Sequence, residues 1–161
     1  MDTDNKTRCK WCLKDQLYIK YHDEEWGVPI YNDEKIFEIL LLETFQAGLS
    51  WITVLRKRPE FRKAFDQFNY HKILHYNSQK EKELMNNSSI IRNRLKISAT
   101  IQNANAFIEI QSKKGSFSNY LWEFVNGSPK INLFKNSADI PSFSPLAVTL
   151  SKDLKLKGLR N

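Results

Sequence analysis

Length and composition indicate a single globular domain and exclude several classes of protein. The chain has 161 residues, of which 41% are hydrophobic and 12% aromatic, enough apolar material for a core and too much for a wholly disordered protein. Five glycines and five prolines are few, which disfavours a turn-rich β-sandwich and favours helices. No segment reaches the roughly 18 apolar residues of a membrane span, and the polar N-terminus lacks the apolar run of a signal peptide. We therefore expect a cytoplasmic protein with no membrane partner, whose single domain spans residues 1–161.

Positive charge is concentrated in the later part of the chain. The formal net charge is +7, yet residues 1–60 contain 9 Lys and Arg against 11 Asp and Glu, whereas residues 61–161 contain 16 against 7. Such a basic region could face a polyanion such as nucleic acid. A solvated basic surface explains the composition equally well.

The first third of the chain is predicted to contain one central helix. Residues 1–8 are expected to be a frayed tail, and residues 9–31 an irregular, aromatic-rich segment. Asn32 or Asp33 can cap a helix that extends to a natural stop at Gly48. This helix is apolar nearly all round, which is typical of a helix buried in the middle of a domain.

Shorter helices are expected in the middle of the chain. Ser50 can cap a short helix through residue 57, and Pro59 suits the first turn of a second one. Further helical pieces are expected over residues 71–76 and 80–85.

The last third is also predicted to be helical. Apolar residues at spacings of three and four predict a long helix over residues 90–110, for which Gly115 is a natural end. Another helix is expected over residues 117–125, then a loop over residues 128–143 and a last amphipathic helix that begins at Pro145. Because strand-like alternation is absent from the sequence, the predicted fold class is all-α.

Glu43 is the first candidate functional residue, because it falls on an apolar face of the central helix. The residues of this face follow the i, i+3, i+4, i+7 pattern of a helix: Ile36, Ile39, Leu40 and Glu43. Burying an unpaired carboxylate costs several kcal/mol, or else the group is protonated, so such a residue is often kept for a purpose. A structural glutamate bonded to a backbone amide or to an arginine is the alternative.

Aromatic residues form the second candidate group. They are Trp11, Tyr18, Tyr21, Trp26 and, beyond the central helix, Trp51. Ring faces attract cations by ~0.5–2 kcal/mol each, so aromatics beside a carboxylate suit a flat, positively charged ligand. Burial in a hydrophobic core is the alternative for each ring.

A metal site is the third candidate. In a reducing compartment Cys9 and Cys12 are free thiols or metal ligands rather than a disulfide framework. Cys9 with His22, and with Cys12 as a further candidate, could bind zinc, but a structural zinc site needs four ligands. His71 and His75 are four apart and could meet on a helix or be ordinary surface residues.

A polar turn followed by basic residues is the fourth candidate. Residues 87–89 are Asn-Ser-Ser, and Arg92, Arg94 and Lys96 follow. Amides at a helix start, helped by the helix dipole, can hold a phosphate. A solvated basic face is the alternative.

Taken together, these residues resemble the bacterial DNA-3-methyladenine glycosylase I family. The matching strings are Arg-Cys-Lys-Trp (8–11), Tyr-Ile-Lys-Tyr-His-Asp-Glu-Glu-Trp-Gly-Val-Pro (18–29), Gln-Ala-Gly-Leu-Ser-Trp (46–51), Ile-Ile-Arg-Asn-Arg-Leu-Lys-Ile (90–97) and Trp-Glu-Phe-Val-Asn-Gly (122–127). The resemblance implies a helix-hairpin-helix glycosylase fold and a hydrolase of base excision repair. Its expected partner is double-stranded alkylated DNA, from which it flips out and releases 3-methyladenine, and we expect a monomer.

The resemblance also implies roles for individual residues. Glu43, with Tyr21, would read and hold the base, and the other base-binding aromatics would be Trp51, Tyr18, Trp11 and Trp26. Gly48 and Leu49 would lie in a loop that fills the gap left by the extruded base. The DNA phosphates would be held around Ser89, Arg92, Arg94 and Lys96. Cys9 and His22 would be the first two ligands of a structural zinc ion.

The sequence departs from the family pattern at two points. The family continues past this C-terminus and supplies a further His and Cys to the zinc, so we expect either a truncated domain or a lost metal, and weak zinc binding by two ligands. Ser89 stands where the family usually has glycine. If that position needs a positive φ, serine costs about 1 kcal/mol there.

Two other functions are compatible with these residues. A relative disabled by its shortened C-terminus would bind alkylated DNA without releasing a base. A small-molecule binding module would use the aromatic residues for a cationic ligand and would not bind DNA.

Overall fold

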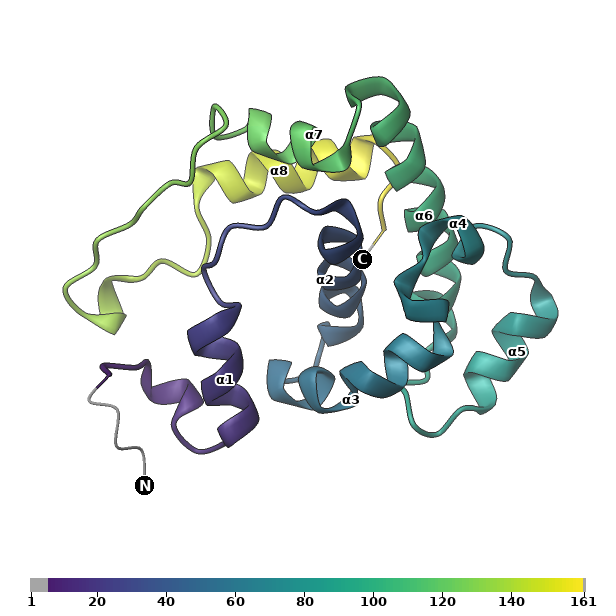
Figure 1. Cartoon of the computed structure of the whole chain (residues 1–161), viewed down its shortest axis with the longest axis horizontal. Helices are drawn as coiled ribbons and strands as arrows, with labels where there is room; N and C mark the ends of the chain where they lie inside the picture. The colour runs from purple at the N-terminus through teal and green to yellow at the C-terminus, as the bar shows by residue number, and fades with distance from the viewer. Residues whose placement is uncertain (1–5, 161) are drawn as a thin grey trace.

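A computed structural model describes residues 6–160, and this part of the chain is all-helical, as predicted (Figure 1). The α-helices are α1 (Gln16–Glu24), α2 (Asp33–Gln46), α3 (Trp51–Ala64), α4 (Tyr70–Ile73), α5 (Ser78–Asn86), α6 (Arg94–Lys114), α7 (Phe117–Glu123) and α8 (Pro145–Leu156). Three single-turn 3-10 helices cover Lys10–Cys12, Asp66–Phe68 and Ser137–Asp139. No helix within residues 6–160 combines the length and apolar character that a membrane crossing needs.

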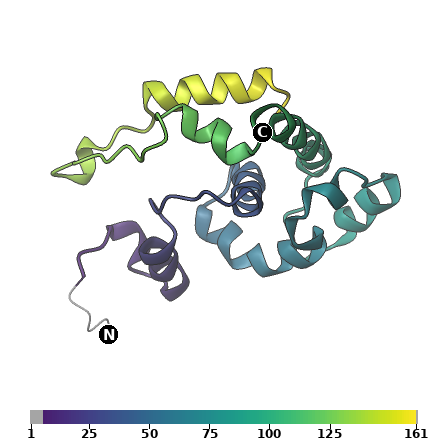
Figure 2. The ribbon, with the colours of Figure 1, turned by 45° about the horizontal axis from the view of Figure 1, so that its top comes forward.

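Helix α2 is the centre of the fold, which confirms the prediction of a central helix. The side chain of Asn32 caps it by accepting a hydrogen bond from the backbone N–H of Lys35. Phe37, Leu41 and Phe45 are fully buried, and α2 contacts α3, α6 and α7. Figure 2 shows α8 lying over α7, with α1 on the far side of α2 from α6.

Several helices differ from the predictions, among them α4, which covers Tyr70–Ile73 rather than residues 71–76, and α5, which covers Ser78–Asn86 rather than residues 80–85. The segment predicted to be irregular contains α1, which Asp15 caps by accepting from the backbone N–H of Tyr18. Helix α3 continues through Pro59, because burial of Leu55 and Phe61 on either side outweighs the ~3 kcal/mol cost of an internal proline. Helix α6 begins at Arg94 rather than residue 90.

The hairpin between α5 and α6 explains the late start of α6. Ile90 is buried, so the chain turns inward there before Asn93 caps α6 by accepting from the backbone N–H of Lys96. Residues 87–93 therefore form a hairpin between two helices, which is the arrangement that the resemblance implied.

The predicted frayed tail lies mostly outside the described residues, which begin at Lys6. Arg8 does not fit that prediction, because its guanidinium makes hydrogen bonds of 2.7–3.0 Å to both carboxylate oxygens of Asp23. Its side chain is only 5% exposed. A buried bidentate pair attaches this part of the chain to α1.

Asp33 joins the beginning of α2 to the beginning of α7. Its carboxylate accepts from the backbone N–H groups of Phe117 and Ser118, each at 2.8 Å. It also accepts from the side-chain amide of Gln111 at 2.6 Å. The first amides of a helix have no partner within the helix. The Asp33 carboxylate therefore stabilises the beginning of α7 and holds α7 against α2.

We expect Asp33→Ala to lower the free energy of unfolding by about 2 kcal/mol, because it leaves two amide donors without an acceptor. Urea unfolding measures this change. The matched control is Glu34→Ala at the exposed neighbouring position, for which we expect a change within about 0.5 kcal/mol. Equal losses in the two variants would contradict this role of Asp33.

Candidate active site

The five predicted aromatic side chains converge around α1. The ring centroid of Trp11 lies 4.6 Å from that of Tyr18 and 5.5 Å from that of Trp26. On the inner side, Tyr21 lies 6.3 Å from Tyr18 and 5.6 Å from Trp51. The structure thus joins rings from the first 3-10 helix, α1 and α3 into one aromatic cluster.

Trp51, the first residue of α3, belongs to both this aromatic cluster and the hydrophobic core. It is 7% exposed. Its indole N–H is buried and has no hydrogen-bond partner among the described residues. Since a buried donor without an acceptor costs about 1–3 kcal/mol, such groups usually bond to water or to a ligand. This side chain is therefore a candidate for contact with a bound molecule.

Glu43 lies in the last turn of α2 and has no hydrogen bond or ion pair to another described residue. The residue is exposed on one side, yet partial burial raises the pKa of its carboxyl above the ordinary value of 4.5. Burial, and next the charge of Glu43, raise the pKa of Tyr21, so the two groups are electrostatically coupled. The alternative of a glutamate already paired within the fold is therefore wrong.

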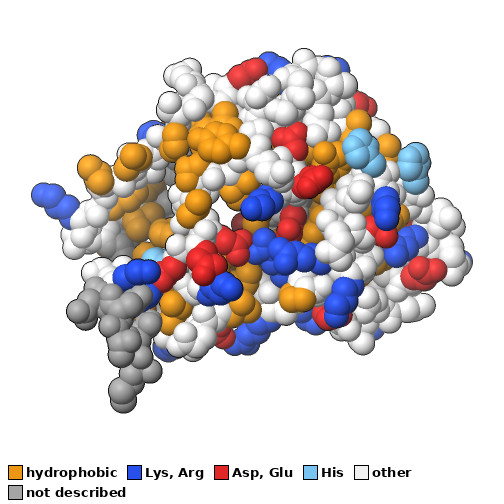
Figure 3. Space-filling model, viewed as in Figure 1, with side chains coloured by type: hydrophobic (Ala, Val, Ile, Leu, Met, Phe, Trp, Pro, Cys, Tyr) orange, Lys and Arg blue, Asp and Glu red, His pale blue; other side chains and the backbone are white. Residues whose placement is uncertain are grey.

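Glu43 also lines an apolar cavity of about 560 Å³ between α2, α7 and α8. Its walls include the aliphatic side chains Ile36, Ile39, Leu40, Leu121, Leu150 and Leu154. Hydrophobic side chains gather over the ends of α7 and α8 nearest α1, beside a hollow (Figure 3). Neither Tyr21 nor Trp51 lines this cavity. The carboxylate thus lies between the cavity and the aromatic cluster, and the three do not enclose a single pocket.

Partly buried ion pairs hold α1, α2 and α3 together beside the site. The guanidinium of Arg58 donates to Glu38 at 2.6 Å and to Glu25 at 2.7 and 2.9 Å. Arg62 donates to the same Glu38 oxygen at 2.8 Å. These pairs fix the end of α1, which follows Tyr21, against α2, which carries Glu43.

The turn between α2 and α3 contains the predicted loop residues. Gly48 has a φ of +82°, a conformation that glycine adopts without strain. Leu49 follows at the tip and is 42% exposed. An apolar side chain is therefore presented to solvent two residues before Trp51.

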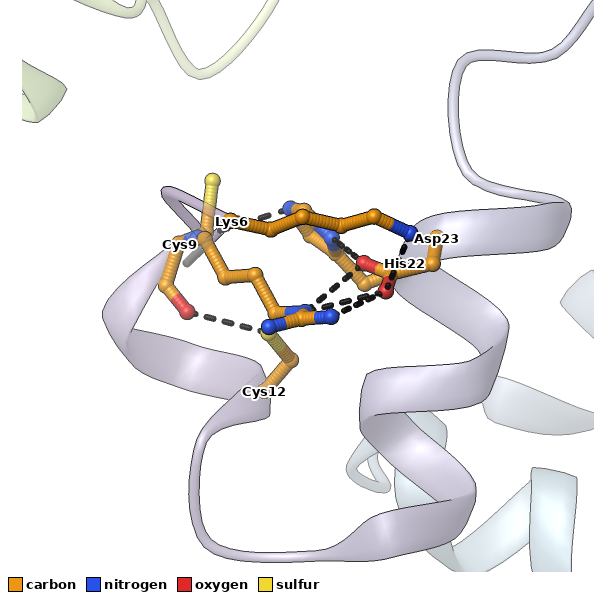
Figure 4. A network of polar contacts seen from close by, with 6 residues as sticks. Lys6, Cys9, Cys12, His22 and Asp23 are labelled. Carbon is orange, nitrogen blue, oxygen red and sulfur yellow. Dashed lines mark hydrogen bonds and ion pairs between the residues drawn. The ribbon is translucent and has the colours of Figure 1, made fainter. Parts of the chain in front are cut away.

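Cys9 and His22 lie next to each other in a network of polar contacts (Figure 4). Asp23 accepts from Nδ1 of His22 at 2.9 Å, and Nε2 accepts from the backbone N–H of Cys9 at 3.4 Å. The hydrogen bonds from Arg8 hold the pKa of Asp23 well below its ordinary range. Cys12 is separate from this pair, because its thiol is buried and donates to the carbonyl of Cys9 at 3.0 Å, and burial raises its pKa.

These residues fit a zinc ion only in part. A carboxylate on Nδ1 is the arrangement found in carboxylate–histidine–zinc sites, but the Nε2 lone pair that a zinc ion would need accepts a hydrogen bond from the backbone N–H of Cys9. Within residues 6–160, however, no group of three or more His, Cys, Asp or Glu could hold a metal ion. His71 lies in α4 and His75 follows that helix, and Figure 1 shows α4 on the other side of α2 from the N-terminal segment.

The basic segment is divided between the hairpin and α6. Arg92 and Arg94 are exposed. Ser89 does not have a positive φ. The cost of about 1 kcal/mol that a positive φ would impose on a serine therefore does not arise. Lys96 differs from the prediction of a free phosphate-binding cation, because its ammonium donates to the backbone carbonyls of Phe45 and Ala47.

Sequence reasoning missed the charged residues that position the site, namely Asp23, Glu25, Glu38, Arg58 and Arg62. Glu38, a charged residue in the largely apolar helix α2, was a signal for one of them. Their partners are on other helices, so the pairing itself was not readable from spacing.

Comparisons with known proteins agree with this geometry. The family model described as Methyladenine glycosylase matches residues 11–161. The DNA-3-methyladenine glycosylase of Haemophilus influenzae is 41% identical over 152 residues, which cover 94% of this chain and 82% of that protein.

Two similar solved structures are also of this kind. A crystal structure of 3-methyladenine DNA glycosylase I is 43% identical, with a TM-score of 0.91 over 96% of this chain and 85% of that one. A glycosylase I variant in complex with 3-methyladenine is 37% identical, with a TM-score of 0.89 over 91% of this chain and 79% of that one. The family model and these relatives match most of the chain, and the chain belongs to the methyladenine glycosylase family.

Proposed function

We propose that this protein removes 3-methyladenine from alkylated double-stranded DNA, as an N-glycosyl hydrolase of base excision repair. The observation that carries the proposal is the carboxylate of Glu43, which has no partner among the described residues and lies beside Tyr21. The similar glycosylase bound to 3-methyladenine supports the choice of base. We further propose that the protein acts as a monomer in the cytoplasm.

The chemistry of the lesion reduces what the protein must do. Methylation at N3 gives the adenine a positive charge and weakens its bond to the sugar. When the N–C1′ bond breaks, its electron pair neutralises the base, and water adds to C1′ with loss of a proton. The protein must therefore extrude the nucleotide, hold the base and admit water.

Recognition depends on groups that the fold leaves available. Glu43 accepts from the exocyclic amino group of the base, Tyr21 contacts the same edge, and Trp51 stacks on the ring face. Trp11, Tyr18 and Trp26 form the outer part of the aromatic cluster. Unmodified adenine is refused because its pattern of donors and acceptors leaves a buried group unpaired, at ~1–3 kcal/mol.

DNA binding uses the hairpin and the turn between α2 and α3. Arg92 and Arg94 are exposed at the start of α6, where the helix dipole also favours phosphate. Leu49 fills the gap that the extruded base leaves, and Gly48 provides the turn conformation. Because these contacts are electrostatic in part, affinity falls as salt rises.

Glu43→Gln is expected to slow 3-methyladenine release from methylated duplex DNA at least about tenfold, the equivalent of one lost charged hydrogen bond. A single-turnover assay of released base measures this. The matched control is Glu83→Gln on the exposed side of α5, which should keep the full rate. Unchanged release by Glu43→Gln would contradict the role of the carboxylate, and DNA binding without release by the unmodified protein would contradict the proposed activity.

The same substitution, which should slow base release, should raise thermal stability at neutral pH. The pKa of Glu43 is raised in the folded protein, so its contribution to stability is present below the unfolded pKa and is lost as the pH rises through the folded pKa. The Tm of Glu43→Gln relative to the unmodified protein should therefore increase from about pH 4 to about pH 7. Calorimetry over this range checks the sign, and a difference that decreases with pH would show that the carboxylate is stabilised by a partner.

We also propose that Cys9 and His22 bind zinc only weakly in this chain, with Asp23 orienting the imidazole. A zinc ion with a full set of ligands would stabilise the fold by holding the segments that carry those ligands together. Elemental analysis after dialysis should find well under one zinc per chain, since two ligands are half of a structural set. A full equivalent would contradict this proposal.

A further inference from the structure

Lys96 connects α6 to the end of α2 through two hydrogen bonds. Its backbone is fixed in the first turn of α6, where the side chain of Asn93 accepts from its N–H. Its ammonium donates to the carbonyl of Phe45 at 3.0 Å and to that of Ala47 at 2.8 Å. The last carbonyls of a helix have no N–H donor within the helix, so they are free to accept from Lys96. A cation there also interacts favourably with the negative end of the helix dipole.

These two bonds hold the turn that leads to the site. Ala47 leaves the helix with φ −46° and ψ 118°, and Gly48 and Leu49 follow it. The other hydrogen bonds described for this turn are local: Leu49 N–H to the carbonyl of Gln46, and the hydroxyls of Ser50 and Thr53. Within the described residues, Lys96 thus supplies the hydrogen bonds that join the turn to a distant helix.

A second lysine joins α3 to the hairpin before α6. The ammonium of Lys57 donates to the carbonyl of Ser89 at 3.0 Å. Lys96 therefore connects α6 to the end of α2 and to the turn that follows it, and Lys57 connects α3 to the hairpin. This arrangement fixes the exposed tip of the turn relative to the residues expected to meet the phosphates.

We propose that Lys96 is a positioning residue that keeps Leu49 in place during base extrusion, and that it does not contact a phosphate. The inference rests on the glycosylase function proposed above. Leu49 is 42% exposed and lies outside the hydrophobic core, so its position depends on the hydrogen bonds of the turn, of which those from Lys96 reach another helix. A displacement of about 1 Å in such a group can slow a reaction by up to about 100-fold.

Base binding itself does not depend on Lys96. Trp51 is held by burial in the core, and Glu43 lies within the regular helix α2, two residues before Phe45. Loss of the ammonium therefore loosens the tip of the turn more than it disturbs these two side chains. This difference separates positioning from a general structural role.

The test compares Lys96→Met, which keeps an unbranched stem and removes the donors, with Lys96→Arg and Arg94→Met. Single-turnover release of 3-methyladenine from methylated duplex DNA should fall at least about tenfold in Lys96→Met and recover largely in Lys96→Arg. Binding of free 3-methyladenine, followed by tryptophan fluorescence, should change less than about twofold. The slope of log affinity for duplex DNA against log salt should be unchanged in Lys96→Met and smaller by about one in Arg94→Met.

Three results would overturn the inference: normal base release by Lys96→Met, equal loss of base release and free-base binding, or a reduced salt slope. The first excludes a positioning role, the second indicates a structural one, and the third indicates a phosphate contact. Absence of base release by the unmodified protein would instead contradict the proposed function, so the two failures are distinguishable.

Discussion

A carboxylate that is partly desolvated and has no partner within the described chain is the interaction on which the site depends. Glu43 could have been neutralised by a nearby arginine, as Glu38 is by Arg58 and Arg62. It is instead left beside Tyr21, where its charge raises the pKa of the phenol. Partial burial disfavours the ionised form of Glu43 in the free protein, and a ligand that supplies a hydrogen-bond donor favours that form.

The rest of the fold keeps that carboxylate and the aromatic cluster at a fixed separation. Asp33 holds α7 against the start of α2, and Arg58 holds the end of α1 against α2 and α3. Arg8 attaches the N-terminal segment to Asp23. Each bond joins segments far apart in sequence, so the rings and the carboxylate meet although no single helix carries both.

Local patterns were sufficient for the central parts of the fold. The buried face of α2 follows from helical periodicity, its cap at Asn32 from residue type, and the late helix from Ser144 and Pro145. Helix α1 was missed because it is only nine residues long and its aromatic residues were interpreted as an irregular segment, whereas their packing partners lie on other elements. Pro59 was misread as a helix start because the burial that overrides it is tertiary.

The candidate site shows the same division between local and tertiary information. The resemblance identified the residues, and the apolar face singled out Glu43, but neither predicted an apolar cavity that Glu43 lines and Trp51 does not. Lys96 has the same residue type as a phosphate contact, and only the fold shows that its ammonium lies on backbone carbonyls. Charge pattern therefore predicts that a segment is basic, whereas tertiary structure decides which cations remain available.

The pKa of Glu43, measured by NMR of its side-chain carboxyl carbon with and without 3-methyladenine, tests the central claim most directly. The account predicts a pKa above 4.5 in the free protein that falls when the base donates a hydrogen bond to the ionised carboxylate. A pKa at or below 4.5 in the free protein, unchanged by the ligand, would contradict it.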